Sequence, residues 1–330
     1  MKILVTGASG FIGGHLIEEL NRRGYDLIAM VRKTSNTELL EELGVELRIG
    51  DLTDPPSLLA ATKGVESIVH LAAYYTFHGK KRLYEMINFE GTRYLLESAL
   101  NNKISHFLYC STTEVIGPVD NLLGNEETPP NPTYEYGKSK LKVEQLIQEF
   151  GQKGLNYTII RSTGIYGPRN INDVAYWFIT SFMKNSMATR IVVGNGENYI
   201  QFVHISDLVQ GIVLALEKSN VSKGQTYIIS DERAYTYNEL NEIMAEICGR
   251  KPPGIYVPPI FAKVMIAPVE LFNRITRREH FLWHTKTVDA VTQDRAYSID
   301  KAKLELGYQP KYDLKMGLQE TVEWYRSIGI

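Results

Sequence analysis

The amino-acid sequence predicts an α/β fold in which helices cover both faces of a parallel sheet, followed by a smaller α/β lobe. In the first half, short apolar runs rich in strand-forming residues alternate with longer amphipathic stretches. A glycine-rich turn follows the first of those runs directly. Beyond residue 166 the alternation gives way to shorter segments. We therefore expect a doubly wound, Rossmann-type parallel sheet over 1–166 and a smaller lobe over 167–330, interleaved with the first part and not folding independently.

The first strand, Ile3 to Val5, runs into a turn that predicts a dinucleotide site. Gly7, Gly10 and Gly13 follow it at three-residue spacing, and an amphipathic helix begins among them. Gly7 permits a sharp turn, Gly10 lets the backbone approach a pyrophosphate, and Gly13 lets the helix pack closely on the sheet. The helix N-terminus then presents unpaired N–H groups and its positive dipole end to the phosphates. Glycines placed between a strand and a helix in this way indicate dinucleotide binding.

The end of the second strand, Leu27 to Val31, bears on which dinucleotide is bound. NAD-selective sites place an acid about twenty residues beyond the glycines, where it accepts a hydrogen bond from the ribose 2′-OH. This chain has Val31, Arg32 and Lys33 there. Valine cannot accept that bond, whereas the two cations can pair with a 2′-phosphate. We therefore expect NADP in preference to NAD, which remains possible; a solvated basic turn is the alternative interpretation.

Further strands are expected over Val45 to Ile49, Ser67 to Leu71, His106 to Cys110 and Tyr157 to Arg161, with a long helix over Lys81 to Leu100. The carboxyl ends of parallel strands meet at one edge of a sheet, where the ligands of open α/β sheets bind. Ala72 and Ala73 follow one strand and permit close contact with a cofactor, although small residues are equally common in packing. Beyond residue 166 we expect helices over Val174 to Met183, Asp207 to Glu217, Tyr237 to Cys248 and Leu314 to Trp324.

Two polar segments suggest acid–base chemistry. Tyr136 and Lys140 stand four residues apart at the start of a helix and so share one face. An ammonium beside a phenol lowers the phenol pKa, so the tyrosine can exchange a proton with an alcohol oxygen. Thr112, in a polar loop after the fifth strand, can hydrogen-bond the same oxygen. Tyr134 and Lys138 are also four residues apart, so spacing alone leaves two candidate pairs.

Together these segments resemble the extended short-chain dehydrogenase/reductases, the family of nucleotide-sugar epimerases and dehydratases, dihydroflavonol reductases and 3β-hydroxysteroid dehydrogenases. The matching motifs cover nearly the full length: Thr6 to Gly13, Gly50 to Leu52, His70 to Ala73, Asn88 to Thr92, Ser111 to Val115, Tyr136 to Lys140, Tyr166 to Arg169, Phe202 to Asp207 and Leu306 to Pro310. In this family the tyrosine is followed by Gly-x-Ser-Lys, which selects Tyr136 and Lys140, and the family's serine or threonine falls on Thr112.

The resemblance also implies a set of cofactor contacts and a homodimer. It places Asp51 on the adenine and the segment from Ser162 near the nicotinamide. The expected cofactor-binding residues are Gly7, Ser9, Gly10, Phe11, Ile12, Gly13, Arg32, Lys33, Asp51, Leu52, Leu71, Ala72, Ala73, Asn88, Tyr136, Lys140, Ser162 and Gly164. Relatives pair through two long helices, here about 81–100 and 133–150.

Two departures from the family bear on the substrate, for which Ser111, Thr113, Glu114 and Arg169 are the candidate contacts. Nucleotide-sugar members usually carry an arginine before Asp-Phe, where it pairs with the diphosphate. This chain has Gln201 before Phe202, so we consider Arg169 or Arg190 as replacements. Glu114 occupies a position that helps to remove a proton in dehydratases, but those enzymes carry a second acid at the preceding position, which is Thr113 here. A structural Glu114 remains an alternative.

The stretch 254–272 is unusually apolar and leaves three interpretations open. It can pack in a core, form an apolar lid over a ring-shaped substrate, or lie on a membrane as a skimming helix. It fails as a membrane span because it contains Lys263, Glu270 and three prolines.

Composition excludes several classes of function. The 36 basic residues nearly balance the 38 acidic ones, which gives no indication of a nucleic-acid partner. Two distant cysteines, Cys110 and Cys248, favour a reducing, cytoplasmic compartment. His204 lies in an apolar run and is expected to be structural, and no cluster has metal-ligand spacing. We therefore expect an enzyme that moves hydride between a nicotinamide and a hydroxyl- or ketone-bearing ring carbon of a small molecule. The alternatives are a nucleotide-sugar epimerase or dehydratase with tightly bound NAD(P), and a non-catalytic NADP sensor.

Overall fold

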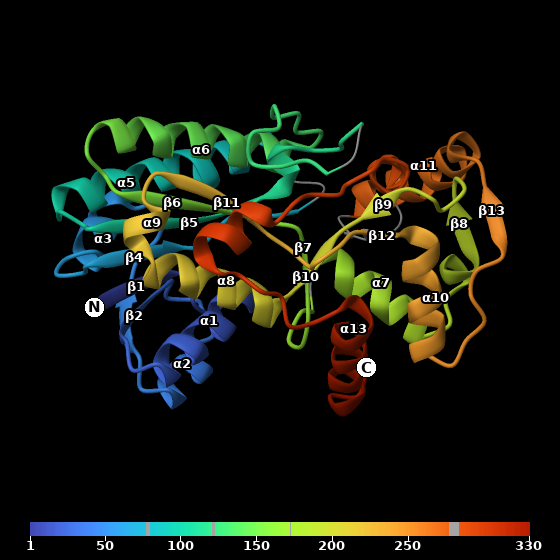
Figure 1. Cartoon of the computed structure of the whole chain (residues 1–330), viewed down its shortest axis with the longest axis horizontal. Helices are drawn as coiled ribbons and strands as arrows, with labels where there is room; N and C mark the ends of the chain where they lie inside the picture. The colour runs from blue at the N-terminus through green and yellow to red at the C-terminus, as the bar shows by residue number, and fades with distance from the viewer. Residues whose placement is uncertain (77–79, 121–122, 172, 277–283) are drawn as a thin grey trace.

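The computed structural model describes residues 1–76, 80–120, 123–171, 173–276 and 284–330. Figure 1 shows a sheet covered by helices at one end of the molecule and shorter strands and helices at the other. The sheet contains seven parallel strands in the order β11-β6-β5-β4-β1-β2-β3. They are β1 (Lys2–Thr6), β2 (Asp26–Val31), β3 (Glu46–Ile49), β4 (Ser67–His70), β5 (His106–Thr112), β6 (Tyr157–Ser162) and β11 (Gln225–Ile229). The predicted fold class is confirmed.

The strand order places a ligand site at the end of β1. The chain runs from β1 outward through β2 to β3, then returns to the other side of β1 and runs through β4, β5 and β6. In open α/β sheets, ligands bind outside the carboxyl ends of the strands at the point where this order reverses. Ile3, Leu4 and Val5 in β1 are fully buried, as expected for a strand covered on both faces.

Helices cover both faces of the sheet (Figure 1). One face carries α1 (Phe11–Arg22), α2 (Glu38–Glu42) and α8 (Ile205–Glu217). The other carries α3 (Pro55–Ala61), α5 (Gly91–Asn101) and α6 (Glu135–Gln152). The single helix expected over Lys81 to Leu100 has three parts, α4 (Lys81–Leu83), a π-helical segment (Tyr84–Glu90) and α5. Such wide turns occur often at functional sites, and this one contains Asn88.

The smaller lobe begins after β6 but returns once to the main sheet. Helix α8 and strand β11 come from residues 205–229, and β11 pairs in parallel with β6 from Gln225 opposite Thr158 to Ile229 opposite Ser162. The sequence predicts the parallel sheet over 1–166, so β11 lies beyond the predicted sheet. The seventh strand was not predicted, because its pairing with β6 is not visible in the local sequence.

The lobe itself is built from short strands and helices around a core that includes Ile179, Leu240, Met244, Leu318 and Val322. Its strands are β7 (Gly164–Tyr166), β8 (Ile191–Val193), β9 (Tyr199–Ile200), β10 (Phe202–His204), β12 (Tyr235–Thr236) and β13 (Ile255–Val257). Its helices are α7 (Val174–Met183), α9 (Ser219–Ser222), α10 (Tyr237–Ile247), α11 (Pro259–Thr276), α12 (Thr285–Val291) and α13 (Leu314–Ser327), with short helical turns at Met187–Arg190 and Ala302–Leu306. The four helices predicted beyond residue 166 all form, with ends within three residues of the expected ones.

Helix α11 contradicts the core-packing interpretation of 254–272. Ala262 is the residue of this helix that is buried in the fold, whereas Phe261 is 62% exposed and Phe272 is 58% exposed. Most of its large apolar side chains therefore project outward, with Ile266 half-buried on the inner side. Among the described residues, no helix combines the length and hydropathy needed to cross a bilayer.

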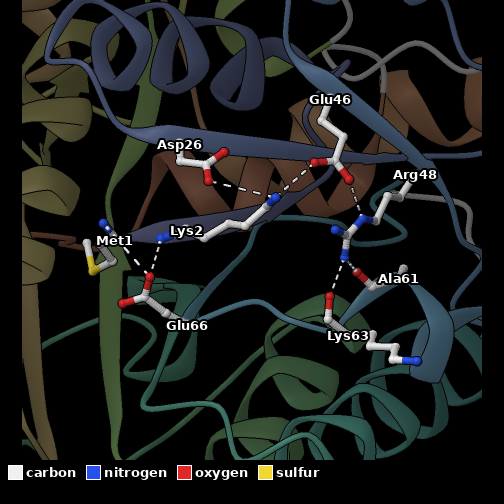
Figure 2. Close-up of polar contacts among 8 residues, drawn as sticks. All are labelled: Met1, Lys2, Asp26, Glu46, Arg48, Ala61, Lys63 and Glu66. Carbon is white, nitrogen blue, oxygen red and sulfur yellow. Dashed lines mark hydrogen bonds and ion pairs between the residues drawn. The ribbon is translucent and has the colours of Figure 1, made fainter.

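Charged side chains link the strands at the amino edge of the sheet (Figure 2). The Lys2 ammonium lies 3.1 Å from Glu46 and 3.7 Å from Asp26, which joins β1 to β2 and β3. Arg48 pairs with Glu46 at 2.7 Å and also donates to the carbonyls of Ala61 and Lys63 at the end of α3. Hydrogen bonds from Arg48 and Lys2 lower the pKa of Glu46. Side-chain pairs therefore connect three strands at this edge.

Candidate active site

The glycine turn has the geometry expected of a phosphate cradle. Gly7 has φ +70°, and a Cβ there would lie 2.8 Å from the backbone nitrogen of Ala72. A Cβ at Gly13 would lie 2.1 Å from the carbonyl oxygen of Gly7, so α1 packs against the turn only without one. Gly10 caps α1, and none of the described side chains caps that helix. Its first N–H groups are therefore available to an anion, and Ser9 lies exposed beside them.

A buried hydrogen-bond network fixes this turn against β4. The Thr6 hydroxyl lies 2.7 Å from His70 Nδ1, and His70 Nε2 lies 2.9 Å from the Thr92 hydroxyl on α5. Thr6 Oγ1 also accepts the N–H groups of Leu71 and Ala72. Burial lowers the pKa of His70 to about 3, so the ring is neutral and connects three elements. The predicted contacts at Leu71 and Ala72 thus lie beside Gly7.

Arg32, Lys33 and Asp51 lie together at the ends of β2 and β3. The N–H of Gly50 donates to the carbonyl of Val31 at 3.0 Å, which brings the two strand ends side by side. The Asp51 carboxylate accepts from the Thr53 N–H and hydroxyl, and these bonds, together with the nearby Arg32 charge, lower its pKa. Val31 is buried, while Arg32 and Lys33 are exposed and form no ion pair with any described residue.

The carboxyl end of β5 holds Thr112 next to the start of α6. Strand β5 extends to Thr112, two residues further than predicted. A Cβ at Gly137 would lie 2.6 Å from the carbonyl oxygen of Glu114. Glycine at that position therefore lets α6 begin directly against the turn after β5. This contact brings Thr112 and Tyr136 to the same edge of the sheet.

The Lys140 ammonium lies inside the protein beneath Tyr136. Its Nζ donates to the carbonyl of Cys110 at 2.7 Å and lies 5.7 Å from the centre of the Tyr136 ring. Burial lowers the pKa of Lys140 to about 8. Burial also raises the pKa of Tyr136, with Cys110 and Glu114 adding to the effect. The expected lowering of the tyrosine pKa is therefore not met in this geometry, because desolvation outweighs an ammonium that is hydrogen-bonded elsewhere.

The structure separates the two candidate tyrosine–lysine pairs. Lys138 forms an exposed ion pair with Glu135 at 3.1 Å. The Tyr134 hydroxyl donates to the carbonyl of Lys286 on α12 at 3.0 Å. Tyr134 and Lys138 thus have different partners, whereas Lys140 lies under Tyr136.

Asn88 and Ser111 hold the framework of the site. The Asn88 side chain accepts from the Tyr74 N–H and donates to the Tyr74 carbonyl and to Ser139 on α6. Ser111 donates to Glu144 at 2.5 Å, and Glu144 is buried against Arg161 at 2.7 Å. Ser111 therefore has a buried partner within the protein, and its predicted contact with substrate stays a prediction.

Arg169 and Gln201 also differ from the expectations for an anionic substrate. Arg169 pairs with Glu18 on α1 at 2.5 Å, so it connects the lobe to the sheet instead of facing a substrate. Gln201 is buried, donates to the Asp231 carbonyl and accepts the N–H of Tyr297. Arg190 is exposed at the end of a short helical turn. Two further predicted contacts, Ser162 and Gly164, lie at the end of β6 and the start of β7.

An ion pair between Glu114 and Arg295 was missed by the sequence analysis. Arg295 Nη1 donates to Glu114 Oε1 at 2.8 Å, and the two side chains are 7% and 29% exposed. Glu114 Oε2 and Arg295 Nε are buried and have no hydrogen-bond partner among the described residues. The guanidinium also lies 5.7 Å from the centre of the Tyr134 ring. Because 181 residues separate the partners, no local spacing could have revealed the pair.

Comparisons with known proteins agree with this geometry. Residues 3–230 match the model of the NAD dependent epimerase/dehydratase family. The chain is 30% identical to a dTDP-glucose 4,6-dehydratase of Actinoplanes sp., covering 99% of this chain and 98% of that one. It is 25% identical to a 3-beta-hydroxysteroid dehydrogenase of Mycolicibacterium neoaurum over 99% and 92% of the two chains. The crystal structure of DesIV, a dTDP-glucose 4,6-dehydratase from Streptomyces venezuelae with NAD bound, superposes with a TM-score of 0.79 at 26% identity, covering 99% of this chain and 97% of that one.

Proposed function

Since the chain belongs to the NAD dependent epimerase/dehydratase family of extended short-chain dehydrogenase/reductase enzymes, we propose that it transfers hydride between a nicotinamide and a ring carbon of a small molecule. That carbon carries a hydroxyl in one direction of the reaction and a ketone in the other. The observation that supports this proposal is the close contact of Gly137 with Glu114, which sets the start of α6, where Tyr136 lies, against the turn that follows Thr112. The glycine turn opens at the same edge.

The residues of the glycine turn fit a dinucleotide. A side chain at Gly7 or Gly13 would fill the cradle, and α1 presents its first N–H groups there. The bound nicotinamide supplies the site that accepts or donates hydride. Thr112 hydrogen-bonds the reacting oxygen and orients it, and Tyr136 delivers or removes its proton. Lys140, beneath Tyr136 at the same edge, holds the nicotinamide ribose.

NADP is the proposed cofactor form, although the family is described by its dependence on NAD. Support comes from Arg32 and Lys33, which are exposed at the end of β2 beside Asp51. Replacing Arg32 by Ala should weaken NADPH binding by about 1.5–3 kcal/mol, the value of a charge-assisted hydrogen bond. NADH binding should barely change, because NADH lacks the 2′-phosphate. Calorimetric titration of both cofactors measures this, and tighter binding of NADH by the unmodified protein would refute the proposal.

A nucleotide-sugar epimerase or dehydratase is the second candidate. It is favoured by the dehydratase relative and by Arg295, a cation at the site that could face a phosphate or carboxylate. The residues after β5 oppose a dehydratase, because the position before Glu114 carries Thr113 and Glu114 itself is paired. Mass spectrometry of small molecules that co-purify with the protein identifies the substrate class. Net accumulation of reduced nicotinamide then distinguishes a dehydrogenase from an enzyme that recycles its cofactor.

We further propose that 1–166 binds the cofactor, that 167–330 supplies the substrate contacts, and that the enzyme is a homodimer. Helices α5 and α6 lie side by side on one face of the sheet (Figure 1) and could pair with the same helices of a second copy. Light scattering at micromolar protein should give twice the mass of one chain, and the mass of one chain would refute the dimer. The unpaired Cys110 and Cys248 support a cytoplasmic location.

A further inference from the structure

Helix α11 carries an exposed apolar face along its whole length. At about 100° per residue, eight residues fall within an arc of about 140°. Seven of them are large side chains between 58% and 72% exposed, and the eighth is Pro268. They are Ile260, Phe261, Val264, Met265, Pro268, Leu271, Phe272 and Ile275. The largest apolar patch on the surface of a protein is often a functional one.

The apolar face turns away from the candidate active site. On its opposite side α11 contacts α12, where Lys263 lies 2.5 Å from Asp289 and Glu270 accepts the N–H of Thr285. On α12 the carbonyl of Lys286 accepts a hydrogen bond from the Tyr134 hydroxyl. Helix α12 therefore lies between the inner side of α11 and Tyr134. For this reason the outward face of α11 is not placed to cover a substrate beside Tyr136. The lid interpretation therefore finds no support.

The size of the face does not suit a protein partner. A helix of 18 residues is about 27 Å long and about 10 Å wide, so its footprint is about 300 Å². A stable protein interface buries about 800 Å² on each partner. A single in-plane helix is instead a sufficient unit for contact with a bilayer surface.

The charges beside the face fit an anionic surface. Arg274 lies on one flank of the arc and is exposed, so its long side chain can extend toward lipid headgroups while its stem remains on apolar surface. Lys263 is instead paired with Asp289 on α12. Glu270, the acid of this helix, is turned inward to Thr285 and to His284, whose Nε2 lies 3.3 Å away. Pro268 has no N–H for the carbonyl of Val264, and that carbonyl can be hydrated at an interface but not in hydrocarbon.

We propose that α11 docks the protein on the surface of a bilayer containing anionic phospholipid, with its apolar face inserted to the depth of the headgroup region. Phe261 and Phe272 are the main anchors, and Arg274 contributes attraction to the lipid charge. The proposal does not depend on the enzyme's substrate or cofactor.

Vesicle flotation of the full chain tests this surface. The probes are vesicles of phosphatidylcholine alone and vesicles with equal amounts of phosphatidylcholine and phosphatidylglycerol. We expect the protein to float with the anionic vesicles and to bind them several-fold more weakly when Arg274 is changed to Glu. The double change Phe261→Ser and Phe272→Ser should reduce binding at least about tenfold. Leu304→Ser is the matched control, because Leu304 is 87% exposed on another element, and it should bind like the unmodified protein.

The outcomes that overturn the proposal are distinct. Failure to float with anionic vesicles overturns it, and so does flotation that neither phosphatidylglycerol nor Arg274→Glu affects. A light-scattering mass that falls when Phe261 and Phe272 are replaced assigns the face to a second copy of the chain and also overturns it. Thermal unfolding of each variant confirms that the fold is retained, which is expected because the substituted side chains are already exposed.

Discussion

Tyr134 and Tyr136 should respond to the same substitution in opposite ways. The Tyr136 hydroxyl donates to none of the described residues, so Tyr136→Phe removes no hydrogen bond of the folded protein and should leave its stability unchanged. If Tyr136 transfers the proton, the reaction should slow by about 10²–10⁴-fold, the usual contribution of a positioned acid or base. The Tyr134 hydroxyl donates to Lys286 at 3.0 Å. Tyr134→Phe should therefore cost about 0.5–1.5 kcal/mol of unfolding free energy and leave proton transfer intact.

Two measurements on each variant decide this prediction. Single-turnover hydride transfer at saturating cofactor, followed by nicotinamide absorbance, reports the chemical step on the substrate identified by co-purification. Thermal unfolding reports stability, and 1 kcal/mol corresponds to a shift of about 2 °C for a chain of this size. An inactive Tyr134→Phe with an active Tyr136→Phe would show that the wrong tyrosine has been assigned. Full activity in both variants would refute the reductase mechanism.

Three further substitutions test other parts of the site. Gly137→Ala should lower activity at least about tenfold, because its Cβ would lie 2.6 Å from the Glu114 carbonyl oxygen and push α6 away. The control is Gly254→Ala, which has open space around it and should leave activity unchanged in the same assay. As the pH is lowered from about 6.5 to 3, His70 should reduce the free energy of unfolding by at most about 1.4 kcal/mol per pH unit. The cause is that the unfolded chain takes up a proton that the buried ring, with a pKa of about 3, does not. Urea unfolding of His70→Gln should show a shallower pH dependence, and an identical slope would contradict this. Glu114→Gln should lower the free energy of unfolding, measured in urea, by about 1–3 kcal/mol, because it leaves the Arg295 cation unpaired. An unchanged free energy of unfolding would show that the pair contributes nothing to folding.

Local patterns were sufficient to predict the elements that carry the cofactor. The positions of the glycine turn, the strand ends and the Tyr136–Lys140 pair each depend on residues close together in the chain. They could therefore be predicted from sequence. Strand β5 and its neighbours begin and end within two residues of the expected positions. The environment of Tyr136 could not be predicted in this way, because its pKa depends on how deeply the folded protein buries the ring.

Long-range pairings and the orientation of a helix were not predictable. Glu114 and Arg295 meet only after the smaller lobe packs against the sheet, and neither has a distinctive neighbour in sequence. The apolar composition of 254–272 suggested burial, but composition does not say which side of a helix faces inward. In α11 the inward side carries Ala262 and Ile266, and the other large apolar side chains lie outside. Only the packed structure shows that arrangement.

Strand β11 has a consequence for how this protein is made. During synthesis the first six strands emerge from the ribosome before Gln225–Ile229, so β6 waits with one row of backbone N–H and C=O groups unpaired. Exposed strand edges of this kind invite pairing with other chains. In the finished protein one backbone group on the far side of β11 is satisfied by a side chain, since the Ile228 N–H donates to Glu126 at 2.8 Å. A gene fragment that ends near residue 166 would leave β6 permanently at the edge, so expression of the cofactor-binding part alone should give aggregated protein unless α8 and β11 are included.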